Sequence, residues 1–409
     1  MGLVSTELLL IILCSLVILS YFFSIISQYI RVPSVLLLLF AGIGLRMIAD
    51  AYQLNLRLPA TLVEGLGVVG LIMIILEAGL DLKLGRDKIK LVRDSFLSAL
   101  VILVVSVALI TAILHIWLRE DVISCIVYAL PLSIMSSSIT IPSIHNLTPA
   151  KKEFLVYEAS FSDILGIMLF NYFAAPEILT AKSIGIFGFN IIISILLSIV
   201  ISFLLFLVLA RTKLNIKFFL VFSLLVVIYS GGKMLHLPSL LIILVFGMVI
   251  NNWDKIPLPG LLKRYPQKEV DPLREFLHSI TAESSFLIRT FFFILFGYTI
   301  DLSFINDQEV IVVGSLIVLA FFLIRLIYLK FYFRTQVVPE VFFIPRGLIT
   351  IVLFFKIPTS LKLASFNDGI LFFIILSTSI ILSLGMILYK KPAEAVVEDP
   401  QFSERSDIL

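Results

Sequence analysis

The sequence predicts an all-α polytopic membrane protein with about thirteen transmembrane helices. The first observation is composition: of 409 residues, 60% are hydrophobic and only 14% are charged, whereas soluble domains contain about 25% charged residues. The second is segment length, because stretches of roughly 20 apolar residues, enough to cross a bilayer, follow one another with short connections between them. A soluble fold has too little interior to bury this much apolar surface, so the composition excludes a soluble enzyme.

The predicted spans leave little of the chain outside the membrane. Residues 1–390 are expected to form one transmembrane domain, and residues 391–409 a short cytoplasmic tail. The longest connection, near 252–272, is too short for a soluble domain of its own. The spans lie near residues 8–30, 33–50, 61–82, 95–118, 121–147, 153–175, 184–210, 214–234, 236–251, 273–300, 308–330, 336–356 and 366–389.

The distribution of Lys and Arg predicts the orientation of the chain. When the connections are assigned alternately to the two sides, one side collects 21 of the 31 cations and the other only 7. Cytoplasmic connections carry the excess of Lys and Arg, so we expect an external N-terminus and a cytoplasmic C-terminus. The remaining three cations, Arg289, Arg325 and Arg346, fall inside predicted spans, too far from the ends for simple extension to the membrane surface.

Two predicted spans contain helix-breaking residues. In the fifth span, Pro131 and Pro142 flank a run of small polar residues that a lipid-facing helix would not need. This run consists of Ser136, Ser137, Ser138 and Thr140. The twelfth span contains Pro339, Pro345 and Gly347. Proline removes a backbone hydrogen bond, and carbonyls freed at membrane depth are tolerated only against protein or a wet cavity. An ordinary proline kink is the alternative for either span taken alone.

The two interrupted spans lie seven spans apart along the chain. An odd offset means that corresponding helices cross the membrane in opposite directions, as in inverted repeats, here about residues 1–180 and 214–390. Interrupted helices at corresponding positions of such repeats indicate a transport site near the middle of the membrane. We therefore expect inverted repeats with two crossed broken helices.

Glu158 and Asp163 follow the first interrupted span in otherwise apolar surroundings. Five residues on a helix turn through about 500°, or about 140° net, so these carboxylates face different neighbours. Glu158 is expected to pair with an arginine of another helix, with Arg325 as first choice. Arg346 is expected beside the unwound part of the twelfth span, near helix ends whose negative dipole a cation offsets.

Asp163 is the candidate ion-binding residue. A desolvated carboxylate prefers to be protonated, but a small cation bound by the carboxylate and by nearby carbonyls can displace the proton. Competition of two ions for one carboxylate would couple their movements. The alternative is a structural, protonated aspartate that is hydrogen-bonded to a neighbour.

Glu77 is the third acidic residue of interest within a predicted span. A structural ion pair is its expected role, with a place on a proton path as the alternative. Arg289 is expected to pair with Glu77 or with Glu283, and the sequence does not decide between these partners.

These residues resemble the motifs of the cation:proton antiporter superfamily, the sodium/proton exchangers, over essentially all of the transmembrane chain. Ser162 and Asp163 stand at the family's Asn-Asp or Asp-Asp pair, and Glu158 stands at the acid of the electroneutral branch's E-S-x-x-N-D pattern. In that branch the acid pairs with an arginine at the position of Arg325. Other similar segments are Thr140-Ile141-Pro142 for T-D-P, Pro345-Arg346-Gly347 for P/L-R-G, and Leu76-Glu77-Ala78-Gly79 for an F-E-G-G-like helix.

The resemblance implies an antiporter that exchanges Na⁺, with K⁺ or Li⁺ as alternatives, for H⁺ by alternating access at Asp163. It implies ion and proton binding by Asp163, Ser162, Thr140 and Glu158, and supporting charges at Arg325, Arg346, Glu77 and Arg289. Ser162 replaces the family's Asn or Asp, and Ile141 replaces the Asp of T-D-P. The missing second carboxylate suggests electroneutral exchange of one cation for one proton.

The resemblance also implies no cofactor beyond the transported Na⁺ or K⁺ and H⁺, a homodimer surrounded by membrane lipid, and a place in the plasma membrane, for a bacterium the inner membrane. Nothing in the sequence indicates an enzyme or a nucleic-acid partner. Two other functions stay open. One is a sodium-coupled symporter whose arginines hold an organic anion, and the other is a non-transporting membrane sensor that kept the fold.

Overall fold

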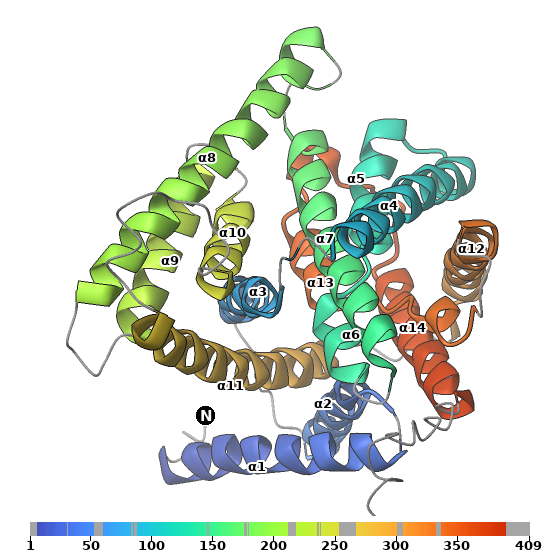
Figure 1. Ribbon diagram of the computed structural model, residues 1–409. Coiled ribbons are helices and arrows are strands. Elements are labelled where there is room, and N and C mark those ends of the chain that lie inside the picture. The colour runs from blue at the N-terminus through green and yellow to red at the C-terminus, as the bar shows by residue number, and fades with distance from the viewer. Residues whose placement is uncertain are drawn as a thin grey trace, which may run out of the picture.

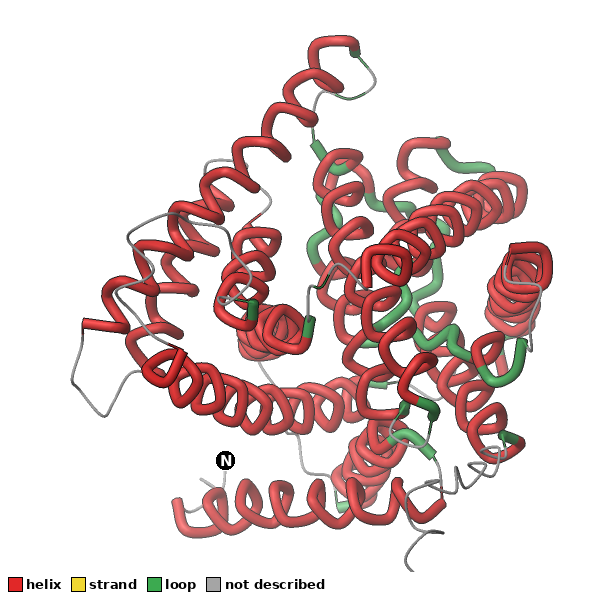
Figure 2. Tube along the Cα trace, in the orientation of Figure 1, coloured by secondary structure: helices red, strands yellow, loops and turns green. Residues whose placement is uncertain are grey.

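The structure is a computed structural model that describes residues 6–30, 32–52, 60–82, 85, 88–144, 147–175, 178, 180–211, 218–234, 237, 239–252, 267–300, 306–332 and 337–389. The predicted tail, 391–409, lies outside these residues. Every regular element in the described part is helical, as predicted (Figure 2). In chain order the elements are α1 (Thr6–Ile30), α2 (Ser34–Ala51), α3 (Ala60–Asp81), α4 (Ile89–Leu118), α5 (Val122–Ser133), α6 (Ser137–Ser143), α7 (Pro149–Phe173), α8 (Ala181–Arg211), α9 (Phe218–Met234), α10 (Ser239–Asn251), α11 (Gln267–Thr299), α12 (Gln308–Tyr332), η5 (Glu340–Phe342), α13 (Leu348–Phe355), η6 (Thr359–Leu361) and α14 (Gly369–Leu388).

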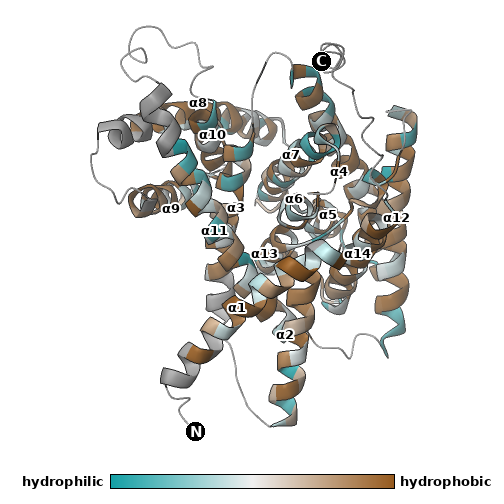
Figure 3. Ribbon diagram, turned by 60° about the horizontal axis from the view of Figure 1, so that its bottom comes forward, coloured by the Kyte–Doolittle hydropathy of each residue, from teal (hydrophilic) through white to brown (hydrophobic). Residues whose placement is uncertain are grey.

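These elements correspond to the thirteen predicted spans. Helices α5 and α6 divide the fifth span, and η5 and α13 divide the twelfth, so both interrupted spans are broken in the structure. By length and composition, seven helices of the described part could cross a membrane, among them α4 and α12. Figure 3 shows α12 brown over most of its length and teal at its lower end, as expected when apolar side chains face lipid and polar ones face water.

The helices form two groups that lie beside each other (Figure 1). The scaffold group consists of α1, α2, α3, α8, α9, α10 and α11, and the core group of α4, α5, α6, α7, α12, α13 and α14. Helix α3 lies between the groups, because it packs on α10 and α11 and also contacts α6, α7 and α13. Both broken helices belong to the core group.

Two helix pairs of the scaffold group approach so closely that their crossings require glycine. Between α2 and α11, a Cβ added to Gly42 would lie 2.2 Å from the carbonyl oxygen of Ile294 and 2.9 Å from Cα of Gly297. Between α3 and α10, a Cβ added to Gly79 would lie 3.0 Å from Cα of Gly247. Small residues allow helix backbones to approach in membranes. Counted seven spans apart, α2 corresponds to α10 and α3 to α11, so the two crossings are equivalent in inverted repeats.

Polar contacts between helix ends fall into two sets, one for each side of the membrane. The contacts near the cation-rich connections join Lys88 to Glu153 at 2.6 Å and Lys151 to Glu340 at 2.7 Å. The contacts at the other helix ends join Asn367 to Asp307 at 2.8 Å and Ser365 to Glu120 at 2.5 Å. In each set, the helix ends in contact are ends that lie on the same side of the membrane when thirteen spans cross it in alternating directions. We call these sides the cation-rich face and the opposite face.

We expect Gly42→Ala to lower the melting temperature of the protein in detergent. The new methyl group must displace the α11 backbone, and overpacking typically costs about 1–3 kcal/mol. Gly44→Ala is the matched control, because it lies on the same helix and a Cβ there would have nothing within 4 Å. Alanine is the better helix former by up to about 1 kcal/mol, so this variant should melt at the same or a higher temperature. Equal destabilisation of both variants would contradict the close approach of α2 and α11.

Candidate functional site

The first broken helix lies in the middle of the core group. Helix α5 ends at Ser133, residues 134–136 are extended, and α6 begins at Ser137. Pro131, in the last turn of α5, has no N–H and weakens the helix near this point. The break therefore lies between Pro131 and Pro142, as predicted, and nearer to Pro131. Thr140, expected in the unwound stretch, lies within α6 instead.

The second broken helix is less symmetrical than the sequence predicts. Helix α13 begins at Leu348, but only the short 3-10 helix η5 precedes the break, and residues 343–347 are not helical. The backbone N–H of Ser136 in the first break donates to the carbonyl oxygen of Pro345 in the second at 2.9 Å. A Cβ added to Gly347 would lie 2.6 Å from Oγ of Ser136. The two breaks are thus in direct contact, which confirms that the broken helices cross.

Asp163 lies on α7 beside this crossing. Its side chain is fully buried, and neither carboxylate oxygen has a hydrogen-bond partner. The hydroxyl and backbone N–H of Ser137, the first residue of α6, point toward the carboxylate but do not reach the geometry of a full hydrogen bond. The hydroxyl of Thr140 is also buried without a partner, and residues three apart on a helix share one face. The structure thus gathers one carboxylate and two unpaired hydroxyls at the start of α6.

The residues next to Asp163 hold the first break in place. Oγ of Ser162 accepts a hydrogen bond from the backbone N–H of Met135 at 2.9 Å. One turn further along α7, a Cβ added to Gly166 would lie 2.2 Å from the side chain of Ile134. The small side chains of α7 therefore let the extended chain of the break lie directly against the helix. Ser162 is close to Asp163, as predicted, but one lone pair of its oxygen is already used by the backbone.

Glu158 and Arg325 form a buried ion pair between α7 and α12. The guanidinium nitrogens Nη1 and Nη2 of Arg325 lie 3.1 and 2.7 Å from the two carboxylate oxygens of Glu158, and each residue is 1% exposed. The hydroxyl of Ser98 donates to Glu158 at 2.5 Å, and Nε of Arg325 donates to the carbonyl oxygen of Glu340 at 2.5 Å. This is the partner that the sequence favoured, and the pair is neutral as a whole.

Arg346 lies beside the second break and is also buried. Its Nε donates to the carbonyl oxygen of Leu132 near the end of α5, and its Nη1 donates to the carbonyl oxygen of Ile344 at 3.0 Å. The guanidinium carbon lies 3.9 Å from the centre of the Phe321 ring, within the range of a cation–π contact. These partners are carbonyl groups and a ring rather than a carboxylate. Arg346 thus places a positive charge where helix carbonyls are left unpaired, as predicted from the helix dipole.

Arg289 pairs with Glu77 rather than with Glu283. Nη2 of Arg289 lies 3.5 Å from a carboxylate oxygen of Glu77, and both side chains are largely buried between α11 and α3. Glu283 instead accepts a hydrogen bond from the Tyr21 hydroxyl at 3.0 Å. The structure therefore decides between the two partners that the sequence left open. This pair belongs to the scaffold group, separate from the crossing of the broken helices.

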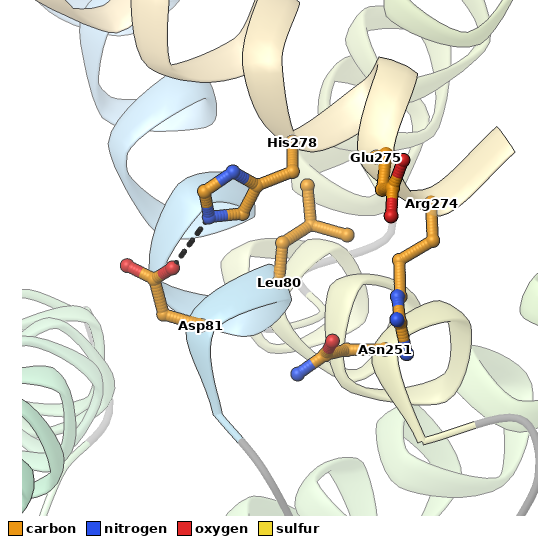
Figure 4. A pocket seen from close by; sticks show the side chains of 6 residues that line it. All are labelled: Leu80, Asp81, Asn251, Arg274, Glu275 and His278. Atoms are coloured by element: carbon orange, nitrogen blue, oxygen red, sulfur yellow. Dashed lines mark hydrogen bonds and ion pairs between the residues drawn. The ribbon is translucent and has the colours of Figure 1, made fainter. Parts of the chain in front are cut away.

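Two cavities differ strongly in size and position. The larger, about 420 Å³, lies at the cation-rich face between α3, α10 and α11, where His278 lies 2.7 Å from Asp81 (Figure 4). Its lining residues come from the scaffold group and not from the broken helices. The smaller, about 10 Å³, lies beside the crossing and is lined in part by Glu158, Ser162 and Arg346. It has room for about one water molecule.

The sequence predicted the pairing of Glu158 with Arg325 and the position of Arg346 beside the second break. It did not reveal several residues that hold these charges in place. Ser98, which donates to Glu158, looks like any small residue of an apolar helix. Met135 and Ile134 act through backbone position and bulk, for which a single sequence carries no signal. Ser137 was visible within the polar run of the fifth span, and its position at the start of α6 is what distinguishes it from its neighbours.

Crossed broken helices beside a buried, unpaired carboxylate define a class of protein, the helical membrane transporters that bind ions near the middle of the membrane. The sequence matches the family of transmembrane sodium/hydrogen exchangers over residues 15–389, and the chain belongs to this family. It is therefore a cation:proton antiporter and not an enzyme. No curated protein matches the sequence.

Solved structures of a sodium proton antiporter share the fold. The structure of MjNhaP1 from Methanocaldococcus jannaschii at pH 8 superimposes with a TM-score of 0.67 at 16% identity, covering 91% of this chain and 98% of the other. An electron-microscopy map of the same antiporter gives a TM-score of 0.65 at 18% identity, covering 95% of this chain and 100% of the other. At this identity the likeness extends to the fold alone.

We expect Arg325→Met to destabilise the protein strongly. Removing one partner of a buried ion pair leaves an uncompensated charge and typically costs about 3–5 kcal/mol. Adding Glu158→Gln removes that charge, so the double variant should recover much of the lost stability. Thermal unfolding of the wild type, both single variants and the double variant gives the coupling between the two residues. A double variant no more stable than Arg325→Met would contradict the pairing.

Proposed function

We propose that the chain exchanges Na⁺ for H⁺, with K⁺ and Li⁺ as alternative cations, and that Asp163 binds the cation and the proton in turn. The observation that carries this proposal is the buried Asp163 carboxylate, which has no partner on either oxygen. Burying a carboxylate without a partner is costly unless it is protonated or holds a cation. A purely structural aspartate in such a place is expected to be hydrogen-bonded.

The hydroxyls of α6 complete the proposed ion site. Ser137 and Thr140 lie on the same face of α6, and Ser137 points toward Asp163. Hard cations are bound by oxygen ligands, which these hydroxyls can supply. The break at residues 134–136 lies against α7 next to Asp163 through Ser162 and Gly166, and in this proposal its backbone carbonyls supply further oxygens. In this proposal the hydroxyl of Ser162 holds the break in place through its hydrogen bond with the backbone N–H of Met135. Its contribution to ion binding is this positioning of the break.

Competition at Asp163 couples the two ions. The carboxylate holds either a proton or a monovalent cation, so the loaded site is neutral in both directions of the cycle. The charge of Glu158 is balanced by Arg325. The charge of Arg346 is fixed because the guanidinium stays protonated. The proposed exchange is therefore electroneutral, one cation for one proton.

The remaining charges have supporting roles in this proposal. Glu158 contributes through its ion pair rather than as an ion ligand, because Arg325 and Ser98 already occupy its oxygens. Glu77 and Arg289 stabilise the packing of α3 on α11. Helix α3 contacts both groups, so this pair fixes the surface along which the core group moves.

Alternating access requires the core group to move against the scaffold group. The fully buried Asp163 must become accessible from each side in turn, and the broken helices are the elements that carry the ion site between the two sides. We propose that the scaffold group forms the interface of a homodimer in the lipid bilayer. We also propose a plasma membrane location, the inner membrane in a bacterium, with the cation-rich face in the cytoplasm.

The two other functions considered from the sequence have less support. A symporter of organic anions needs a guanidinium free to hold a carboxylate, whereas Arg325 is bound to Glu158 and Arg346 donates to backbone carbonyls. A non-transporting sensor offers no reason to keep Asp163 buried without a partner. Uptake of an organic anion, or silence with all cations, would favour these alternatives in turn.

We expect Asp163→Asn to abolish cation-dependent proton exchange. Asparagine has nearly the same shape but cannot be protonated or carry the charge that binds a cation. Proteoliposomes containing a pH-sensitive dye and an acidified interior should show dequenching on addition of Na⁺ only with the wild type. Asp50→Asn is the control, since this side chain is 71% exposed at the end of α2. Exchange retained by a folded Asp163→Asn variant would refute the site.

We expect the exchange rate to be independent of the membrane potential. If each cycle moves one cation and one proton in opposite directions, no net charge crosses the bilayer. Initial rates of Na⁺-dependent pH change should therefore agree when a potassium gradient and valinomycin set the potential to zero or to about −100 mV, each elementary charge being worth about 2.3 kcal/mol at that voltage. Rates that follow the imposed potential would show an electrogenic stoichiometry.

A further inference from the structure

A side-chain contact joins the two helix groups at the opposite face. Nζ of Lys356 lies 3.1 Å from the hydroxyl oxygen of Tyr229. Lys356 follows the last residue of α13 in the core group, and Tyr229 belongs to α9 in the scaffold group. The tyrosine is 8% exposed, so the contact is partly withdrawn from water and is weakened less by solvent than an exposed ion contact.

This contact acts on the broken helix at short range. Helix α13 runs from Leu348 at the break to Phe355, a length of about 12 Å. A short helix transmits the position of one end to the other, so holding Lys356 against α9 also holds the break that contacts Ser136. The contact therefore bears on the ion site although it lies near the membrane surface.

The described contacts between α13 and α3 at the glycines of α3 are apolar. A Cβ added to Gly67 of α3 would lie 2.7 Å from the Val352 side chain, and one added to Gly70 would lie 3.4 Å from Leu348. At these two positions apolar side chains of α13 fit against glycines of α3, and such contacts have no directional preference. A directional polar bond beside these apolar contacts is well placed to stabilise one arrangement of α13 relative to the scaffold group.

Between described residues, two polar side-chain contacts that join the groups lie at the opposite face. A second one joins the Tyr172 hydroxyl of α7 to the Ser183 hydroxyl of α8 at 3.2 Å, where the chain passes from the core group to the scaffold group. At the cation-rich face, the ion pairs of the described residues each stay within one group. They join Lys88 to Glu153, Arg93 to Asp94 and Lys151 to Glu340 in the core group, and His278 to Asp81 in the scaffold group.

We propose that Lys356 and Tyr229 form a latch that closes the opposite face, and that this bond must break whenever Asp163 is exposed to that side. The proposal rests on the proposed alternating access. Among the contacts described above, those that join the two groups lie at the opposite face. We therefore interpret the structure as a state that is closed to that side. The latch is a positioning device and does not touch the transported ion.

The expected effect follows from the strength of a hydrogen bond to a charged group. Such a bond shifts a two-state equilibrium by roughly tenfold to hundredfold. Tyr229→Phe removes the hydroxyl and keeps the ring, so it should raise the population open to the opposite face by about tenfold or more. Lys356→Met should do the same, and the double variant should add little to either single one.

Cysteine labelling tests the latch without relying on ion transport. The protein has two cysteines, Cys14 and Cys125, which are replaced by alanine, and Val352→Cys then places one thiol on the α13 surface that faces α3. A membrane-impermeant maleimide is added to each side of reconstituted vesicles in turn. We expect Tyr229→Phe to accelerate labelling from the opposite face by about tenfold and not from the cation-rich face.

Tyr128→Phe is the matched control. Its hydroxyl accepts a hydrogen bond from the backbone N–H of Leu363 at 3.2 Å, at the same face but within the core group, so labelling should be unchanged. Unchanged labelling with Tyr229→Phe, or equal acceleration with both variants, would overturn the latch. Failure of the wild type to exchange ions would instead refute the proposed function, because the labelling rates are measured independently of transport.

Discussion

The centre of this molecule is governed by a requirement for backbone partners: two helices break within the membrane, and the groups they release must be satisfied by the protein itself. The N–H of Met135 is bound by the Ser162 hydroxyl, the N–H of Ser136 by the carbonyl of Pro345, and the carbonyl of Leu132 by Arg346. These partners come from a neighbouring helix, from the other break and from a buried cation. Because each partner belongs to a different element, the crossing is held from several sides.

The buried charges divide into those that are balanced and one that is not. Glu158 with Arg325, and Glu77 with Arg289, are pairs that carry no net charge. Arg346 is surrounded by carbonyl oxygens and an aromatic ring, which offset a positive charge without removing it. Asp163 alone among the buried acids discussed here lacks such compensation. In the proposed exchange a mobile ion would supply this compensation, so that a proton and a metal cation could replace each other at one carboxylate.

The sequence predicted the fold well because the membrane restricts what a chain can do. Apolar segment length indicated thirteen spans, and prolines marked the two interrupted helices. Charges inside spans identified Glu158, Asp163, Arg325 and Arg346, since burying a charge is expensive and needs a reason. The first break, residues 134–136, lies between Pro131 and Pro142 as predicted, but it is shorter than that stretch, because Thr140 lies within α6. The choice of Glu77 for Arg289 depended on distances between helices, which one sequence does not contain.

The glycine crossings of the scaffold group have a further consequence for motion. Where Gly42 faces Gly297 and Gly79 faces Gly247, backbone meets backbone without side chains between them. Such a joint has no rotamers to reorganise and gives up almost no side-chain entropy when it forms. The two crossings therefore hold the scaffold helices at a short separation. The proposed alternating access would move the core group without repacking these crossings.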